Sequence, residues 1–229
     1  MSTLCLATSE ILDLFAEEIE FRSGRVTDTF DDGRRLFTRS VLPQLDEVRP
    51  NDRVQGGVAL KATSKEICVY PYVFREVCRN GAVMAQSLQA HRLVLSTDDS
   101  SGEVAAEIRE AVGACCQPEV FDVFVQEIRT SIDTVADMEL TILSYLSQLR
   151  KIGSGEILSQ VIGRFFGDGD SSRFGLMNAV TSVARDTADP EDRWRLEEMG
   201  GGIAAGIVPK PPANAPGIQL EHPAAMALG

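Results

Sequence analysis

The sequence has few of the residues that build metal centres or catalytic triads. Its 229 residues include only two histidines, His91 and His222, and none of its five cysteines forms a CxxC pair. Structural zinc sites usually draw their ligands from cysteine and histidine at such short spacings. No GxGxxG or P-loop pattern opens a helical segment, so the common dinucleotide and triphosphate cradles are missing as well. We therefore expect neither a metal nor a cofactor.

Long apolar runs are also absent. No stretch approaches the roughly 20 apolar residues that a membrane-spanning helix needs. The segment MSTLCLATSEILDLFAEEIE at the start lacks the basic region of a signal peptide and becomes acidic. These features predict a cytoplasmic protein without membrane association, in which an odd number of cysteines stays as free thiols. The cysteines are Cys5, Cys68, Cys78, Cys115 and Cys116.

Basic residues are outnumbered by acidic ones, 22 to 34, which gives a net charge of −12. The imbalance differs along the chain. Residues 1–21 hold five acids and no Lys or Arg, and residues 93–229 hold 10 basic against 21 acidic residues. Residues 22–92, by contrast, hold 12 basic and 8 acidic residues. The charge of residues 22–92 alone favours a nucleic-acid partner.

The basic segment has the residue pattern of a sheet. RVTDTFDDGRRLFTRSVLP alternates Thr, Val and Phe with polar residues around Asp32-Gly33, which predicts a hairpin. Two further strands are predicted near residues 57–63 and 66–71. Pro71 is expected to end the second of these, because proline cannot donate to a strand ladder.

The segments that flank these strands favour helix. Ser9 is placed to cap a short amphipathic helix at the start of the chain. Residues 72–90 favour a helical turn or short helix, in which Asn80-Gly81 is either the C-cap or an internal turn.

The second half of the chain, from about residue 102, is predicted to be helical. An apolar stripe from Phe121 to Leu149 predicts one long helix, or two in succession, ending at Gly153. Three further helices are expected to begin after caps at Ser154, Ser172 and Asp189-Pro190, and Gly200–Gly202 is expected to stop the last one.

The predicted fold class is therefore α+β, with a short N-terminal helix, an antiparallel sheet of about four strands and a helical C-terminal half. We expect residues 1–100 to form the β-rich part and residues 101–207 to form helices packed on it as one unit. The Pro- and Ala-rich residues 208–229 are expected to form an extended or disordered tail.

The strand GRRLFTRSV carries the main candidate for a binding surface. Alternation places Arg35, Phe37 and Arg39 on one face of the strand. Arginines can meet phosphates while an aromatic ring stacks on a base, as single-strand binding requires. The alternative is that Phe37 is a core residue and the arginines are edge or surface charges. The full predicted nucleic-acid-binding set is Arg34, Arg35, Phe37, Arg39, Lys61, Lys65, Arg75, Arg79 and Arg92.

Cys78 lies between Arg75 and Arg79, and His91 follows thirteen residues later. A thiol nucleophile needs a base such as histidine to form the thiolate. Cysteine is also among the most frequently buried residues, and no third group is apparent to orient the histidine. We therefore favour a structural Cys78 and predict no catalytic residue and no enzyme.

Two short segments carry a family resemblance. They are Arg75-x-Val77-Cys78-x-Asn80-Gly81 and Asn178-Ala179-Val180-Thr181. Because of these two segments, the chain resembles the phage- and plasmid-like proteins grouped as domain of unknown function 932. The resemblance covers roughly residues 24–200. The resemblance implies a protein of mobile elements and no established activity. In element order the chain is more distantly similar to single-strand annealing recombinases of the Red-beta, RecT and Erf kind. Those proteins assemble into rings or filaments and hold single-stranded DNA along a basic groove.

The charge distribution and this resemblance favour the same function. We expect a non-enzymatic protein that binds single-stranded DNA, forms homo-oligomers and promotes annealing in recombination. The alternative is a structural or partner-binding protein of a mobile element, whose acidic helical half holds a basic partner. An enzyme with a site around Cys78 and His91 is the third class.

Overall fold

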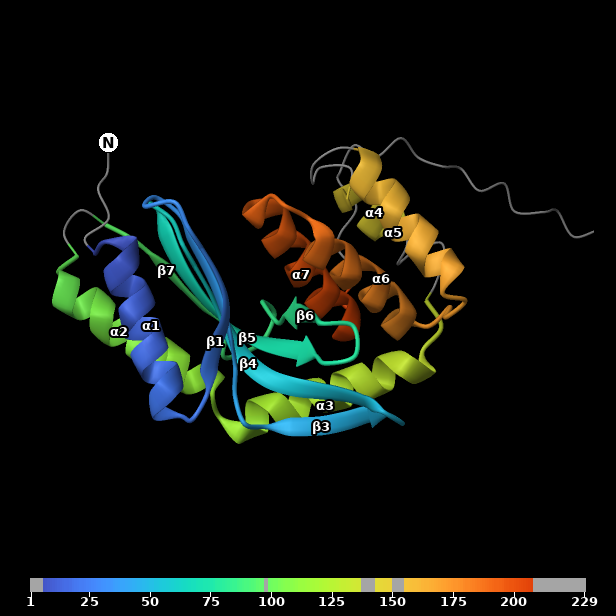
Figure 1. Cartoon of the computed structure of the whole chain (residues 1–229), viewed down its shortest axis with the longest axis horizontal. Helices are drawn as coiled ribbons and strands as arrows, with labels where there is room; N and C mark the ends of the chain where they lie inside the picture. Colours follow the sequence, from blue (N-terminus) through green and yellow to red (C-terminus); the bar gives the residue numbers. More distant parts are fainter. Residues whose placement is uncertain (1–5, 97–98, 137–142, 150–154, 208–229) are drawn as a thin grey trace, which may run out of the picture.

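A seven-stranded antiparallel sheet lies at the centre of the computed structural model, which describes residues 6–96, 99–136, 143–149 and 155–207 (Figure 1). Its strand order is β1-β2-β4-β5-β6, with β3 paired to one part of β4 and β7 paired to one part of β5. The strands are β1 (Arg25–Asp31), β2 (Leu36–Val41), β3 (Leu45–Arg49), β4 (Asp52–Ala62), β5 (Glu66–Arg75), β6 (Asn80–Val83) and β7 (His91–Val94).

One helix precedes this sheet and the others follow it, which confirms the predicted α+β class. No helix in the described part of the chain is long and apolar enough to span a membrane. The helices are α1 (Thr8–Phe21), α2 (Ser101–Cys115), α3 (Pro118–Asp133), α4 (Leu143–Leu149), α5 (Gly155–Gly167), α6 (Arg173–Asp186) and α7 (Pro190–Ala204).

The sheet is covered on both faces, and β4 shows how its residues are shared between them. Val58, Leu60 and Ala62 pack in one hydrophobic cluster with α1 and α2. Ala59, between two of them, points to the opposite face and joins a cluster that contains Trp194 of α7. Figure 1 shows α1 and α2 on one side of the sheet and α7 on the other.

Local sequence signals account for where several helices begin. Ser100 caps α2 by accepting from the backbone N–H of Glu103, whose carboxylate accepts from the Ser100 N–H in return. Pro118 stands in the first turn of α3, where a missing N–H costs no hydrogen bond. Ser172 and Asp189 cap α6 and α7 as the sequence predicted. The predicted cap at Ser154, the helix end at Gly153 and the tail at 208–229 lie outside the described residues.

Three predictions of element ends were wrong. The first helix begins at Thr8 after Ala7, not after a Ser9 cap, and the Glu10 carboxylate accepts from the Ala7 N–H. β5 continues through Pro71, which lies where its outer partner changes from β7 to β6, so no ladder there needs the missing N–H. Gly200–Gly202 do not stop α7, which continues to Ala204.

The short helix expected over residues 72–90 was also wrong. The chain instead completes β5, turns, and returns as β6 from Asn80. Gly81 permits this return, because a Cβ there would lie 2.0 Å from the Tyr72 hydroxyl oxygen. The estimate of about four strands missed the shortest elements, β3, β6 and β7, which have four or five residues each.

The close approach of α7 to β6 gives a first prediction. A Cβ on Gly201 would lie 2.1 Å from the carbonyl oxygen of Val83, so we expect Gly201→Ala to lower the free energy of unfolding by about 1–3 kcal/mol. Gly202→Ala is the matched control. Its Cβ would lie 3.5 Å from the Tyr145 hydroxyl oxygen, an ordinary contact distance, and alanine favours helix. Urea denaturation measures both, and equal losses would contradict the packing argument.

Candidate nucleic-acid interface

The turns of two hairpins lie side by side at one end of the sheet. Leu36 at the start of β2 pairs with Ala62 at the end of β4, which brings the β1–β2 turn next to the β4–β5 turn. The end of β7 reaches the same place, because Val94 pairs with Glu66. Several of the predicted binding residues come from these turns and the strand ends beside them.

The β1–β2 turn is held by Asp32. Its carboxylate accepts from the backbone N–H groups of Arg34 and Arg35 and also from the Arg35 guanidinium, at 2.8 to 3.0 Å. The hydrogen bonds from Arg35 lower the pKa of Asp32. Gly33 supplies the left-handed conformation of the turn, with φ at 76°. Arg34 is exposed and has no acidic partner among the described residues.

Phe30, beside this turn, presents an aromatic ring to solvent. The residue is 38% exposed, and the Arg35 guanidinium lies 5.7 Å from its ring centroid. Sequence reasoning missed Phe30 because alternation in GRRLFTRSV drew attention to Phe37. The predicted hairpin could have pointed to Phe30, because Phe30 pairs directly with Phe37 across the two strands.

Phe37 is fully buried, so the expectation that it lies on an exposed face was wrong. Its ring stands between Phe30 and Trp194, at centroid distances of 6.2 and 6.0 Å. α7 covers this face of the sheet, which the strand pattern alone could not show. Phe37 therefore stabilises the core, and it has no free face for a base.

Arg39 is buried beside Phe37 in a cluster of alternating charges. Its Nε donates to Glu197 of α7 at 2.7 Å, and its Nη1 lies 3.2 Å from Asp28. Arg193 pairs with the same two carboxylates, at 2.8 Å from Asp28 and 3.2 Å from Glu197. Arg39 is thus enclosed by the protein's own acids, and the prediction that it lies on an exposed face was wrong.

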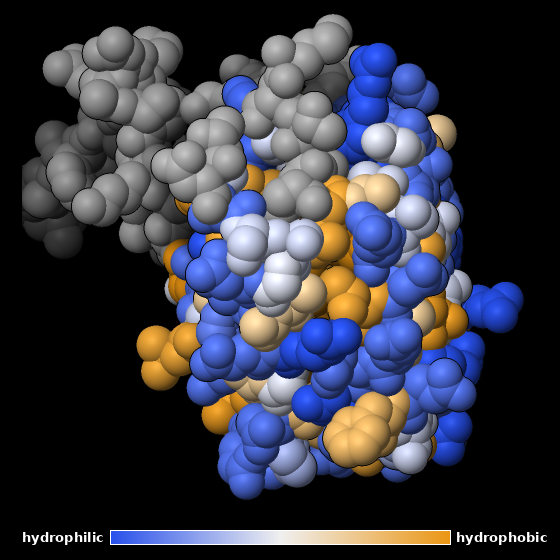
Figure 2. Space-filling model, turned by 90° about the vertical axis from the view of Figure 1, so that its left-hand side faces the viewer, coloured by the Kyte–Doolittle hydropathy of each residue, from blue (hydrophilic) through white to orange (hydrophobic). Residues whose placement is uncertain are grey.

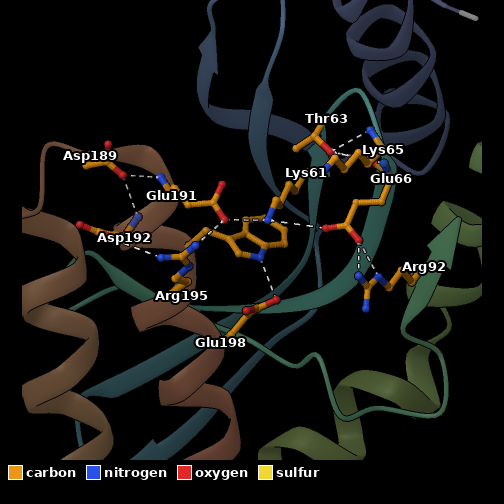
Figure 3. Close-up of polar contacts among 11 residues, drawn as sticks. Lys61, Thr63, Lys65, Glu66, Arg92, Asp189, Glu191, Asp192, Arg195 and Glu198 are labelled. Carbon is orange, nitrogen blue, oxygen red and sulfur yellow. Dashed lines mark hydrogen bonds and ion pairs between the residues drawn. The ribbon is translucent and has the colours of Figure 1, made fainter. Parts of the chain in front are cut away.

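Lys61 is also engaged within the protein. Figure 3 shows its ammonium group between two carboxylates, at 2.9 Å from Glu191 and 3.9 Å from Glu66. Arg92 shares Glu66, with Nε at 2.6 Å from one carboxylate oxygen, yet remains 64% exposed. Lys65 is exposed at the β4–β5 turn, and no acidic partner is found for it in the described part of the chain.

Beneath this network, Glu198 accepts from the Trp194 indole N–H at 2.8 Å (Figure 3). Burial raises the pKa of Glu198. The start of α7 therefore presents acids to the sheet, and these acids partly neutralise the nearby basic residues. The tip surface, by which we mean Phe30, Arg34, Arg35, Lys65 and Arg92, lies at the rim of this network.

Arg75 and Arg79 lie at the other end of β5 from the tip surface. Arg75 donates to both carboxylate oxygens of Asp52, at 2.7 and 2.6 Å, and to Asn178 of α6. Arg79 is exposed, with a left-handed φ of 51°. The predicted binding residues therefore form two separate groups, with Phe37 and Arg39 buried between them.

The two segments that carried the family resemblance meet at Arg75. Its Nη1 also lies 3.3 Å from the Cys78 sulfur, and Asn80 donates to Thr181 at 2.8 Å. Residues about 100 positions apart in the sequence thus form one hydrogen-bonded cluster, which joins the β5–β6 turn to α6. Every contact named here is internal, so the cluster supports the fold.

Cys78 and His91 are not brought together. His91 pairs with Val69, six residues along β5 from Arg75, which corresponds to about 20 Å of strand. Cys78 follows beyond Arg75, with its sulfur against the arginine. Within the described residues, no group of three or more His, Cys, Asp or Glu side chains could hold a metal ion.

Comparisons with known proteins add no relative. No family model matches the chain, and neither a curated protein nor a solved structure matches it. The resemblance to domain of unknown function 932 and to annealing recombinases therefore stays a prediction.

The two rings of the β1–β2 hairpin give a second prediction. Phe37→Ala should lower the free energy of unfolding by about 3–5 kcal/mol, because it leaves a cavity against Trp194. Phe30→Ala should cost only about 1 kcal/mol, because that ring is partly in water already. Thermal and urea unfolding of the two variants test this. A larger loss of stability for Phe30→Ala than for Phe37→Ala would show that Phe30, and not Phe37, is the buried ring.

Proposed function

We propose that this protein binds single-stranded DNA at the tip surface and promotes annealing, as a non-enzymatic cytoplasmic protein of a mobile element. The observation that carries the proposal is an exposed phenyl ring beside exposed cations on two neighbouring hairpin turns. Single-strand binding combines these two features, because cations follow the backbone while an aromatic ring stacks on a base of any identity.

Arg34 and Lys65 supply the cations best suited to phosphate. Both are exposed and lack an acidic partner in the described structure, so contact with a phosphate breaks no ion pair. Two strand spacings separate their turns, or about 10 Å. A single strand crossing the end of the sheet would therefore meet one free cation at each turn.

Phe30 supplies the stacking platform on the edge strand β1, beside the turn that carries Arg34. Arg35 lies over its ring and is fixed there by Asp32, which keeps the guanidinium beside any base that stacks on Phe30. Arg92 extends the positive side along β7, although Glu66 holds part of its charge. Phe37, Arg39, Lys61 and Arg75 take no part in this proposal because they are engaged inside the fold.

The small number of unpaired cations limits the expected electrostatic contribution to the affinity for single-stranded DNA. Two to four phosphate contacts correspond to a slope of log affinity against log salt of about −1.4 to −2.8 for a single strand. The net charge of −12 opposes additional contacts. We therefore expect annealing to depend on several copies of the chain acting on one strand.

The third prediction concerns the cations. Arg34→Ala and Lys65→Ala should each reduce the salt slope by about 0.7, because each removes one phosphate contact. Arg25→Ala is the matched control, since Arg25 is an exposed arginine at the far end of β1. Fluorescence-anisotropy titration of a labelled oligonucleotide at several salt concentrations gives the slopes. The proposal fails if no binding occurs at low salt, or if the control weakens binding equally.

The fourth prediction concerns the ring. Phe30→Ala should cost about 1–3 kcal/mol of binding free energy to single-stranded DNA, since it removes one stacking contact. Phe30→Trp should keep or increase affinity, because a larger ring stacks at least as well. The same titrations measure both variants, and annealing of complementary oligonucleotides should follow the same order. Unchanged binding for Phe30→Ala would remove the stacking role.

A second candidate function rests on the side of the sheet that α1 and α2 cover, opposite α7. α1 and α2 carry many exposed acids and one exposed basic residue, Arg109. Figure 2 shows this face as mostly hydrophilic. Such a surface suits a basic protein partner. If the tip-surface variants leave DNA binding unchanged, this partner-binding function takes precedence. The exposed acids are Glu10, Asp13, Glu17, Glu20, Glu103, Glu107 and Glu110.

A further inference from the structure

Two adjoining cavities lie between α3, the end of α7 and the chain that joins β6 to β7. The first, an open depression of about 420 Å³ in the surface, is lined by residues of α3 and α7 together with Arg173. The second, of about 370 Å³, lies under residues 84–89. They share Val123, Glu127 and Ala205, so Glu127 stands where one cavity meets the other. Both volumes lie in the range of small-molecule sites.

Arg173, on the wall of the first cavity, has no carboxylate partner among the described residues. Its Nε is buried and forms no hydrogen bond, and no ion pair to the residue is found in the described structure. The other partly buried arginines and lysines of the described chain each have a carboxylate partner, as Arg49 has in Asp170 and Lys61 in Glu191. The guanidinium of Arg173 lies against Gly206, where a Cβ would come within 2.1 Å of Nη1.

Glu127 is the corresponding unmatched acid. Its Oε2 is buried and has no hydrogen-bond partner in the described part of the molecule. Burial raises the pKa of Glu127, while the charge of Arg173 acts in the opposite direction. The two side chains therefore influence each other across the cavity, yet no ion pair joins them. Both residues line the first cavity and neither has an ion-pair partner in the described structure, so their charged groups suit a ligand that pairs with both.

The second cavity supplies an apolar wall next to Glu127. Met84, Val120 and Phe124 line it, together with Ile207. Leu88 stands at the rim of this cavity and is 96% exposed. An apolar group that entered here would pack against Met84, Val120 and Phe124 while its polar end stayed beside Glu127.

We propose that the two cavities form one binding site for a small zwitterion with an apolar side chain, which is the chemistry of a free apolar α-amino acid. The ammonium group would donate to Glu127, the carboxylate would accept from Arg173, and the side chain would fill the cavity under Leu88. This site shares no residue with the tip surface, so it can be tested independently of DNA binding.

Ligand chemistry gives the first arm of the test, on the full-length unmodified protein. Isothermal titration calorimetry with L-leucine, L-methionine and L-phenylalanine should show saturable binding of at least one of them. Three relatives of leucine should bind at least about tenfold more weakly, because each lacks one interaction. N-acetyl-L-leucine lacks the ammonium group, L-leucinamide lacks the carboxylate and glycine lacks the apolar side chain.

Side-chain variants give the second arm. Glu127→Gln and Arg173→Gln should each weaken binding of the best ligand by at least about tenfold. Both should keep or raise the melting temperature, since neither removes an existing pair. Glu119→Gln, an exposed acid on α3 outside both cavities, is the matched control and should leave affinity unchanged.

Three results would overturn the proposal. They are the absence of saturable binding for all three amino acids, equal binding of glycine and leucine, and unchanged affinity in both cavity variants. A fall in melting temperature for Glu127→Gln would also count against it, because it would show that Glu127 already has a stabilising partner. DNA binding measured on the same samples should not change, which keeps the two proposals separable.

Discussion

A buried ion pair between Arg39 of β2 and Glu197 of α7 joins two segments that are 158 positions apart in the chain. Asp28 and Arg193 close a ring of alternating charges around it, so the edge hairpin and the last helix are fixed to each other. Burying a charge without a partner is costly, and removing one partner of a buried pair typically costs about 3–5 kcal/mol. The position of α7 over the sheet depends on this ring.

The placement of α7 decides what the sheet can offer to a ligand. Trp194 covers Phe37 and Tyr70, and Glu191 captures Lys61, so much of the basic and aromatic character of β2 and β4 is used inside the molecule. What remains accessible lies at the turns, where Arg34 and Lys65 are exposed. Function in this protein is therefore expected at the end of the sheet, and the strand faces serve as core.

Pairing of charges also separates structural side chains from candidate binding side chains. Most described arginines have an acidic partner, including Arg49, Arg53 and Arg75, and these residues hold elements together. The exceptions fall into two kinds. Arg25, Arg34 and Arg79, together with Lys65, are exposed and unpaired in the described structure, and of these Arg34 and Lys65 belong to the tip surface. Arg173 is partly buried and unpaired, which suits a small ligand.

The sequence by itself determined the α+β class, the β1–β2 hairpin at Asp32-Gly33, and the starts of α6 and α7 at Ser172 and Asp189. These depend on local rules of turn residues, alternation and capping, which act within a few positions. Only the tertiary structure decided that Phe37 and Arg39 are buried and that Phe30 is exposed. Alternation places residues on a face, but whether that face meets water depends on α7, which lies more than 150 residues further along the chain.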